Sequence, residues 1–338
     1  MLPLGADRKR CMAGKVTVRG MRLQHLFRFF ELGNFQHEGR FQGTLPGHRP
    51  GGPAVSLNRS SFEEIIERVH TIPSLPEVVS QVSRLVNEPM ANSSDVTQIM
   101  VKDAAMAAKM LRMVNSVYYG LSDPVHDMEQ AVQILGFKTI RSIALSISVL
   151  NTFQQQNACF NMKAFWAHGA VSACLCRMIA ERSKVCDPEL AFTIGLLKGM
   201  GKLVLVESAP DETRAIVAVA REYKLSFHAA AREVLDTDDA EIGGWLAERW
   251  ELEKVIVETI RNQYSLAAEQ QTGPVAMCLF CEYLCALKKL RVSGECDEPT
   301  LDMGVWSHLG LDKNALVELL TRVNDEVDNA RQLMALAS

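Results

Sequence analysis

Apolar residues recur along this chain with a period of about 3.6 residues from Ser60 onward, and almost never with a period of two. This pattern predicts amphipathic helices rather than strands. Proline, glycine and asparagine interrupt the pattern at helical lengths, which predicts about a dozen helices. Such interruptions are sparse between Lys138 and Ser183, where we expect two long helices. The sequence therefore indicates an all-α, multi-helix protein.

Several helix starts are marked by residues that accept hydrogen bonds from free backbone N–H groups. Ser60 to Glu64 offers a capping box, in which a serine precedes a glutamate by three residues. Asp103 is expected to cap another helix. Asp187 is followed by Pro188, which suits the first turn of a helix. These signals predict local boundaries that do not depend on the rest of the fold.

Residues 1–59 differ from the rest because they are rich in arginine, glycine and proline. Residues 1–60 carry ten Lys/Arg and three Asp/Glu, a net charge of +7. Since the whole chain has a net charge of −4, the remaining residues carry a net charge of −11. We expect this segment to be disordered. Three explanations for it stay open: an artefact of the chosen start site, a flexible basic tail, or an organelle-targeting presequence. The acidic remainder repels nucleic-acid phosphates, so no nucleic-acid partner is expected. Binding through the basic segment is the alternative.

The periodic part of the chain divides near residues 266–273, which are polar and end in Gly273-Pro274. We expect one domain over 60–265 and a helical extension over 266–338 that packs on it. No apolar run reaches about 18 residues, and no secretory signal is recognisable, so no membrane association is expected. An odd count of nine cysteines in a chain of this length indicates reduced thiols and a cytoplasmic location.

Three short motifs superficially suggest ligand binding, and each fails on its spacing. Gly195 to Lys202 has five residues between its outer glycines and lacks the following Ser/Thr, so it is not a phosphate loop. Asp236 to Glu241 lacks the glycine of a calcium loop and fits an acidic helix start. Cys278, Cys281 and Cys285 share one helix face, which favours core packing over zinc. No cofactor or metal is therefore expected.

The order of several motifs resembles the HDOD domain family over roughly Phe62 to Ser265. The matching segments are, in order, Thr71 to Val79, Lys102 to Gly120, Ala131 to Gly136, Phe165-Trp166 with His168, Gly195 to Leu197, Gly201 to Leu203, and Glu241 to Gly243 with Trp250. Within them stand the family-motif positions Leu75, Pro76, Asn115, Ser116, Tyr118, Gly136, Trp166, Gly201, Lys202, Gly243 and Trp250.

The resemblance implies an HD-superfamily-like helical bundle, related to phosphohydrolases whose His and Asp ligands hold divalent metals. Position by position, His168 matches the first histidine, whereas Lys198-Gly199 stands at the His-Asp pair. Asp239 stands at a later histidine, and Asn262-Gln263 at a still later histidine pair. The resemblance thus implies a degenerate metal site with no catalytic residue. We also considered that Lys198 replaces the metal's charge as a partner for Asp239.

The favoured interpretation is a non-catalytic regulatory module of bacterial signal transduction, or pseudoenzyme. It is expected to act by binding a signalling protein, with a nucleotide as the other candidate ligand. A divergent metal-dependent phosphohydrolase is the alternative. The polar stretch Asn115 to Tyr119 is expected to cap a helix end with buried polar groups, although a recognition surface is the other option.

Overall fold

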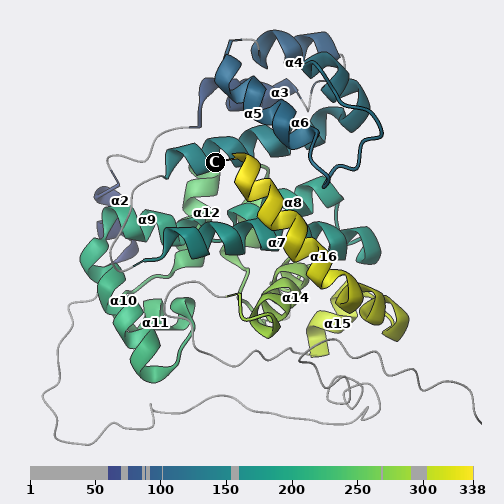
Figure 1. Ribbon diagram of the computed structural model, residues 1–338. Helices are drawn as coiled ribbons and strands as arrows, with labels where there is room; N and C mark the ends of the chain where they lie inside the picture. Colours follow the sequence, from purple (N-terminus) through teal and green to yellow (C-terminus); the bar gives the residue numbers. More distant parts are fainter. Residues whose placement is uncertain are drawn as a thin grey trace, which may run out of the picture. The chain divides into compact units, whose positions relative to one another are not determined.

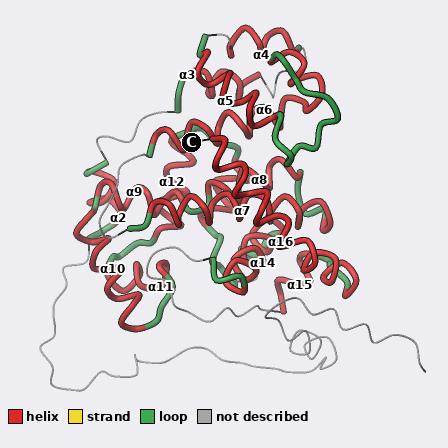
Figure 2. The backbone as a smooth tube through the Cα atoms, in the orientation of Figure 1, coloured by secondary structure: helices red, strands yellow, loops and turns green. Residues whose placement is uncertain are grey.

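The computed structural model of this protein describes residues 60–69, 75–85, 88, 92–100, 102–153, 160–267, 269–290 and 303–337. The predicted basic segment 1–59 lies outside them. A compact unit extends over Ser56–Ser338. Its described residues form helices joined by loops, without a β-strand (Figures 1 and 2). The all-α prediction is confirmed.

The described residues contain fifteen helices, where the sequence predicts about a dozen. In chain order they are α2 (Phe62–Glu67), α3 (Glu77–Leu85), α4 (Ser93–Met100), α5 (Ala104–Val114), α6 (Met128–Thr152), α7 (Met162–Ser183), α8 (Pro188–Leu197), α9 (Met200–Ser208), α10 (Pro210–Tyr223), α11 (Phe227–Val234), α12 (Asp239–Arg249), α13 (Lys254–Arg261), α14 (Gly273–Leu287), α15 (Met303–Leu309) and α16 (Lys313–Ala337).

The local helix starts lie where the sequence places them. Ser61 and Glu64 form the capping box of α2 through reciprocal hydrogen bonds. Asp103 accepts a hydrogen bond from the Met106 N–H at the start of α5. Asp187 caps α8, whose first turn contains Pro188. These caps satisfy N–H groups that the helix itself leaves unpaired.

The two long helices expected between Lys138 and Ser183 are the second part of α6 and the whole of α7. Gly136 interrupts α6 with φ 79° and ψ 163°, a conformation open essentially only to glycine. By length and composition α6 could cross a membrane, but 67% of its apolar stretch is buried inside the fold. That burial is typical of a core helix.

Helix α7 lies at the centre of the core. It packs against α8, α14 and α16, so the helices beyond residue 266 cover much of its surface (Figure 1). Helix α6 contacts α3, α4, α5 and α8, while α9 contacts α10 and α12. The cysteines of the predicted face, Cys278, Cys281 and Cys285, are buried, which confirms core packing. The candidate site lies where α7, α8, α9, α12 and α14 supply polar groups to this apolar interior.

Candidate functional site

The junction between α8 and α9 places two of the sequence-predicted site residues. Lys198 is the C-cap residue that follows α8, and Gly199 precedes the first residue of α9. Both helices are largely buried, so their junction is buried with them: the Lys198 side chain is only 4% exposed. The segment Gly195 to Lys202 is thus helical on both sides of a tight junction, and it does not form a phosphate-binding loop.

The Lys198 ammonium forms an ion pair with Glu282, a residue of α14. Gln263 Nε2 donates a hydrogen bond of 2.7 Å to the Lys198 carbonyl oxygen. Burial lowers the pKa of Lys198, but the Glu282 carboxylate outweighs it and holds that pKa well above its usual range. Lys198 is therefore a charged, internally neutralised side chain. Its partner is Glu282, so the suggested pairing of Lys198 with Asp239 is wrong.

His168 of α7 faces the same glutamate. Its Nε2 atom lies 3.4 Å from Glu282 Oε2 and makes no hydrogen bond with a described residue. Burial raises the pKa of Glu282, whereas Lys198 and then His168 lower it, and the net effect is a pKa well below the usual range. Glu282 thus stays ionised between a lysine and a histidine.

Lys198 and Gly199 are poorly suited to hold a divalent metal. A metal ligand needs a lone pair, and the Lys198 ammonium offers three N–H donors and no acceptor. Gly199 supplies no side-chain donor. A Cβ there would approach Phe165 Cε2 to 3.0 Å, so even a short carboxylate would require Phe165 to move. Glu282 supplies a carboxylate, but Lys198 already neutralises it.

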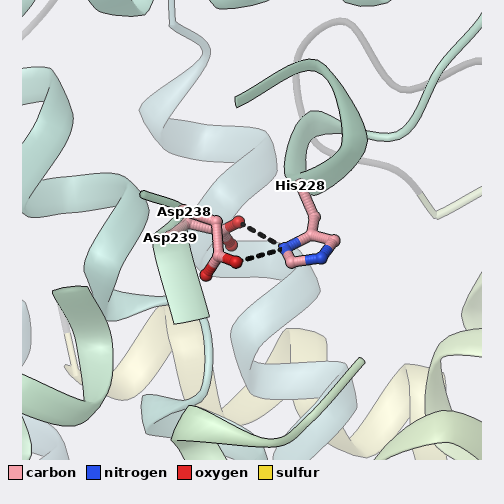
Figure 3. Close-up of side chains that lie close together, drawn as sticks. All are labelled: His228, Asp238 and Asp239. Atoms are coloured by element: carbon pink, nitrogen blue, oxygen red, sulfur yellow. Dashed lines mark ion pairs between the residues drawn. The ribbon is translucent and has the colours of Figure 1, made fainter. Parts of the chain in front are cut away.

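A second polar cluster surrounds Asp239, the first residue of α12, which is 0% exposed. Tyr264 donates a hydrogen bond of 3.1 Å to Asp239 Oδ2. His228 of α11 places Nδ1 3.4 Å from Asp239 Oδ1 and 3.8 Å from Asp238 Oδ2 (Figure 3). Burial raises the pKa of Asp239, but His228, Lys202 and Tyr264 outweigh it, so that pKa lies below its usual range.

Lys202 links the two clusters electrostatically. Its positive charge lowers the pKa of both Asp239 and Glu282. The side chain is buried, and its Nζ lies 5.3 Å from the ring centroid of Phe227, a cation–π distance. The family-motif position Lys202 therefore contributes charge to the interior, between the two carboxylates.

Gly201 and Gly243 allow α9 and α12 to meet backbone to backbone. A Cβ on Gly201 would lie 1.9 Å from the Asp239 carbonyl oxygen, which no relaxation of a side chain can relieve. A Cβ on Gly243 would lie 3.2 Å from the Gly201 nitrogen. This close approach brings Asp239 next to α9.

Asn115 caps the end of α5 as expected, but it is exposed, so the expectation of a buried polar group holds only for Ser116. The Asn115 side chain donates to the Val125 carbonyl at 2.8 Å and accepts from the Val125 N–H at 2.7 Å. The buried Ser116 hydroxyl makes no hydrogen bond with a described residue. Arg177 donates to the Tyr118 hydroxyl at 3.3 Å and lies over its ring. Asn115 thus fixes the loop that leads into α6.

The other sequence-predicted positions have mainly packing roles. Asn262 donates to the Glu258 carbonyl of its own helix at 2.9 Å, so it does not join Lys198. Leu75, Trp166 and Trp250 are buried, and Pro76 leads into α3. Of the predicted site residues, the structure joins Lys198 with Gln263 through one hydrogen bond and places His168 beside Lys198's partner.

Sequence reasoning missed Glu282 and His228, which complete the two clusters. Glu282 carries a signal in hindsight: it is the sole charged residue of α14, an otherwise apolar helix. A lone carboxylate in a buried helix needs a partner of opposite charge. His228 carries no comparable signal, because α11 is an ordinary amphipathic helix.

Comparison with known proteins supports this architecture. The sequence profile of the HDOD domain family matches residues 72–266. A solved structure of an HDOD domain protein with unknown function from Geobacter sulfurreducens is similar with a TM-score of 0.70 and 23% identity, over 80% of this chain and 96% of that one. A protein from Shewanella amazonensis, named as a candidate phosphohydrolase, is similar with a TM-score of 0.63 and 22% identity, over 80% and 97%.

One further relative has no described role. An uncharacterized protein from Treponema pallidum (strain Nichols) is 24% identical over 206 residues. The match spans 60% of this chain but only 39% of that protein's length. At identities below one quarter, these similarities indicate the shared helical fold and leave the chemistry to be argued from the residues.

Proposed function

Because this chain belongs to the HDOD domain family, we propose that it is a non-catalytic signal-transduction module that acts by binding a partner. The observation that carries this proposal is the ion pair between Lys198 and Glu282. By the resemblance, Lys198 occupies the position of a metal-ligating histidine in catalytic members of the superfamily. The fold would then serve as a binding scaffold whose former reaction centre has become part of the core.

The physical argument rests on charge. The raised pKa of Lys198 keeps its side chain protonated at neutral pH, so it cannot donate a lone pair to a metal. A fixed ammonium repels a divalent cation at the same position. Glu282 neutralises that ammonium, so the interior tolerates the lysine without a metal.

The alternative is a divergent metal-dependent phosphohydrolase. His168 and Asp239 retain groups that could ligate, and a similar structure from Shewanella amazonensis is named as a candidate phosphohydrolase. However, His168 faces Glu282, while Asp239 faces His228 and Tyr264. Two ligands directed toward different partners argue against one catalytic ion.

For the partner, we propose a signalling protein, with a nucleotide as the second candidate. The residues beyond position 60 carry a net charge of −11, which disfavours a polyanion such as nucleic acid. Co-purification with the full-length chain as bait, followed by mass spectrometry, would identify a protein partner. Nucleotides would be tested separately by calorimetric titration of the purified chain.

The decisive experiment measures hydrolysis of bis(p-nitrophenyl) phosphate by the purified chain with added Mn²⁺, Fe²⁺ or Zn²⁺. We expect no turnover above the metal alone, and the same result for Lys198→Met. Metal-dependent hydrolysis by the unmodified chain that disappears in His168→Ala or Asp239→Asn would overturn the proposal. Far-UV circular dichroism of each variant would show that lost activity is not lost folding.

A further inference from the structure

Two carboxylates and an imidazole converge at the start of α12, beside the positions discussed above. We propose that His228, Asp238 and Asp239 form a binding site for a divalent transition-metal cation, with zinc as the expected ion. The close-up in Figure 3 shows the imidazole of α11 pointing at both carboxylates. This inference goes beyond the proposed function and does not depend on it.

The geometry suits a small cation. One ligand atom from each of the three residues lies within 4.8 Å of the others. His228 Nδ1 is 3.4 Å from Asp239 Oδ1 and 3.8 Å from Asp238 Oδ2. Zinc bonds of about 2.0–2.1 Å in tetrahedral arrangement separate neighbouring ligand atoms by roughly 3.4 Å. A cation can therefore reach these atoms with small side-chain adjustments.

Two of the three ligand atoms make no hydrogen bond with a described residue. They are His228 Nδ1 and Asp239 Oδ1, both shielded from solvent, and Asp239 as a whole is 0% exposed. Buried polar atoms are almost always hydrogen-bonded, whereas these two form only a long ion pair of 3.4 Å with each other. A cation between the nitrogen and the oxygen would satisfy both.

Hydrogen bonds to the other carboxylate oxygens of Asp238 and Asp239 orient the proposed ligand atoms. Asp238 Oδ1 accepts from the Ala240 and Glu241 N–H groups, which leaves Oδ2 for a cation. Tyr264 donates to Asp239 Oδ2, and its ring lies 4.1 Å from the His228 ring. Such supporting contacts are typical around metal ligands.

Two positively charged side chains lie near the site, and the ligand atoms themselves determine which cation it prefers. The Arg232 Nε atom lies 3.5 Å from Asp238 Oδ2, but this side chain is 68% exposed and can turn into solvent. Lys202 also places a positive charge near Asp239, and this charge weakens the binding of any cation at the site. One nitrogen and two oxygens favour zinc and its neighbours over calcium or magnesium, which prefer oxygen ligands alone.

The site is distinct from the degenerate centre at Lys198 and Gly199. It shares Asp239 with the positions matched to the family, but its other two ligands come from α11 and from the residue that caps α12. A cation there would tie α11 to α12. We assign it a structural or regulatory role, not the activation of water.

The test is titration of the chelator-treated, full-length chain with Co²⁺, followed by visible absorption, and with Zn²⁺, followed by calorimetry. We expect one equivalent to bind without an intense thiolate charge-transfer band. Affinity should fall at least about tenfold in His228→Gln. His126→Gln, at an exposed histidine, is the matched control and should bind as the unmodified chain does.

Several outcomes would overturn the assignment. They are no stoichiometric binding, a thiolate spectrum, or equal affinity in His228→Gln and the unmodified chain. Circular dichroism would check that His228→Gln is folded. If it is not, Asp239→Asn, which keeps an oxygen for Tyr264, would decide by the same tenfold criterion. A metal that binds here without phosphodiester hydrolysis would uphold both proposals, whereas hydrolysis would refute the proposed function alone.

Discussion

The ion pair between Lys198 and Glu282 makes an asymmetric prediction about stability. Replacing Glu282 with glutamine leaves a lysine that is only 4% exposed without its carboxylate. Removing one partner of a buried pair costs about 3–5 kcal/mol. Replacing Lys198 with methionine leaves a glutamate that is 32% exposed and can be hydrated, so we expect about 1–3 kcal/mol. The glutamate variant should therefore be the less stable of the two.

The assay is urea unfolding followed by far-UV circular dichroism, with a double-mutant cycle. The double variant Lys198→Met/Glu282→Gln should lose much less than the sum of the single losses, because no charge remains unpaired in the interior. Lys254→Met, which removes an exposed pair with Glu258, is the control and should cost at most about 1 kcal/mol. Equal, small losses in all variants would refute the reasoning.

The pH dependence of the same pair follows from its shifted pKa values. Because the pKa of Lys198 is raised in the folded state, the lysine stabilises the fold fully below its unfolded pKa of about 10.4. This stabilisation is lost as the pH rises through the higher pKa of the folded state. Because the pKa of Glu282 is lowered in the folded state, the glutamate stabilises the fold above its unfolded pKa of about 4.3. This stabilisation is lost as the pH falls through the lower pKa of the folded state. The stability difference between the unmodified chain and the double variant should be constant between these limits.

Three further predictions concern packing. Gly201→Ala places a Cβ 1.9 Å from the Asp239 carbonyl oxygen, so thermal unfolding should reveal a loss of about 3 kcal/mol or more. Asn115→Ala removes both hydrogen bonds to Val125, and urea unfolding should reveal a loss of about 1–3 kcal/mol. Iodoacetamide at neutral pH should modify the buried cysteines only after unfolding, as mapped by mass spectrometry; they are Cys174, Cys176, Cys278, Cys281 and Cys285.

Each packing prediction has a matched control. Gly169→Ala meets the Leu196 carbonyl oxygen at 3.6 Å, an ordinary contact, and should be nearly neutral. Asn151→Ala removes only one exposed hydrogen bond, from Lys109, and should cost much less than Asn115→Ala. Cys186 is only half-buried and should be alkylated before the buried set. If a control matched its test variant, the packing argument for that position would fail.

Local structure was predictable from the sequence because its causes are local. The caps at Ser61, Asp103 and Asp187 depend on residues within three positions of each helix start. The buried face of Cys278, Cys281 and Cys285 follows from helical periodicity alone. The kink in α6 also has a local cause, because Gly136 adopts a positive φ there.

The partners in the candidate site were not predictable, because they meet across long stretches of chain. Glu282 reaches Lys198 over 84 residues, and no periodicity connects them. His228 meets Asp239 only because α11 folds back onto the start of α12. The suggested role of Lys198 as a charge in place of a metal survives as a proposal, but its partner changes from Asp239 to Glu282.

The central position of α7 has a consequence for how the chain folds during synthesis. Cys281 and Cys285 of α14 reach Ser172 over 109 and 113 residues, and Glu318 of α16 reaches Arg182 over 136. When α7 emerges from the ribosome, the helices that cover its apolar faces have not yet been synthesised. Such non-local contacts slow folding and leave α7 exposed to aggregation or chaperone binding in the interval. Translation speed through residues 184–318 thus sets how long that exposure lasts.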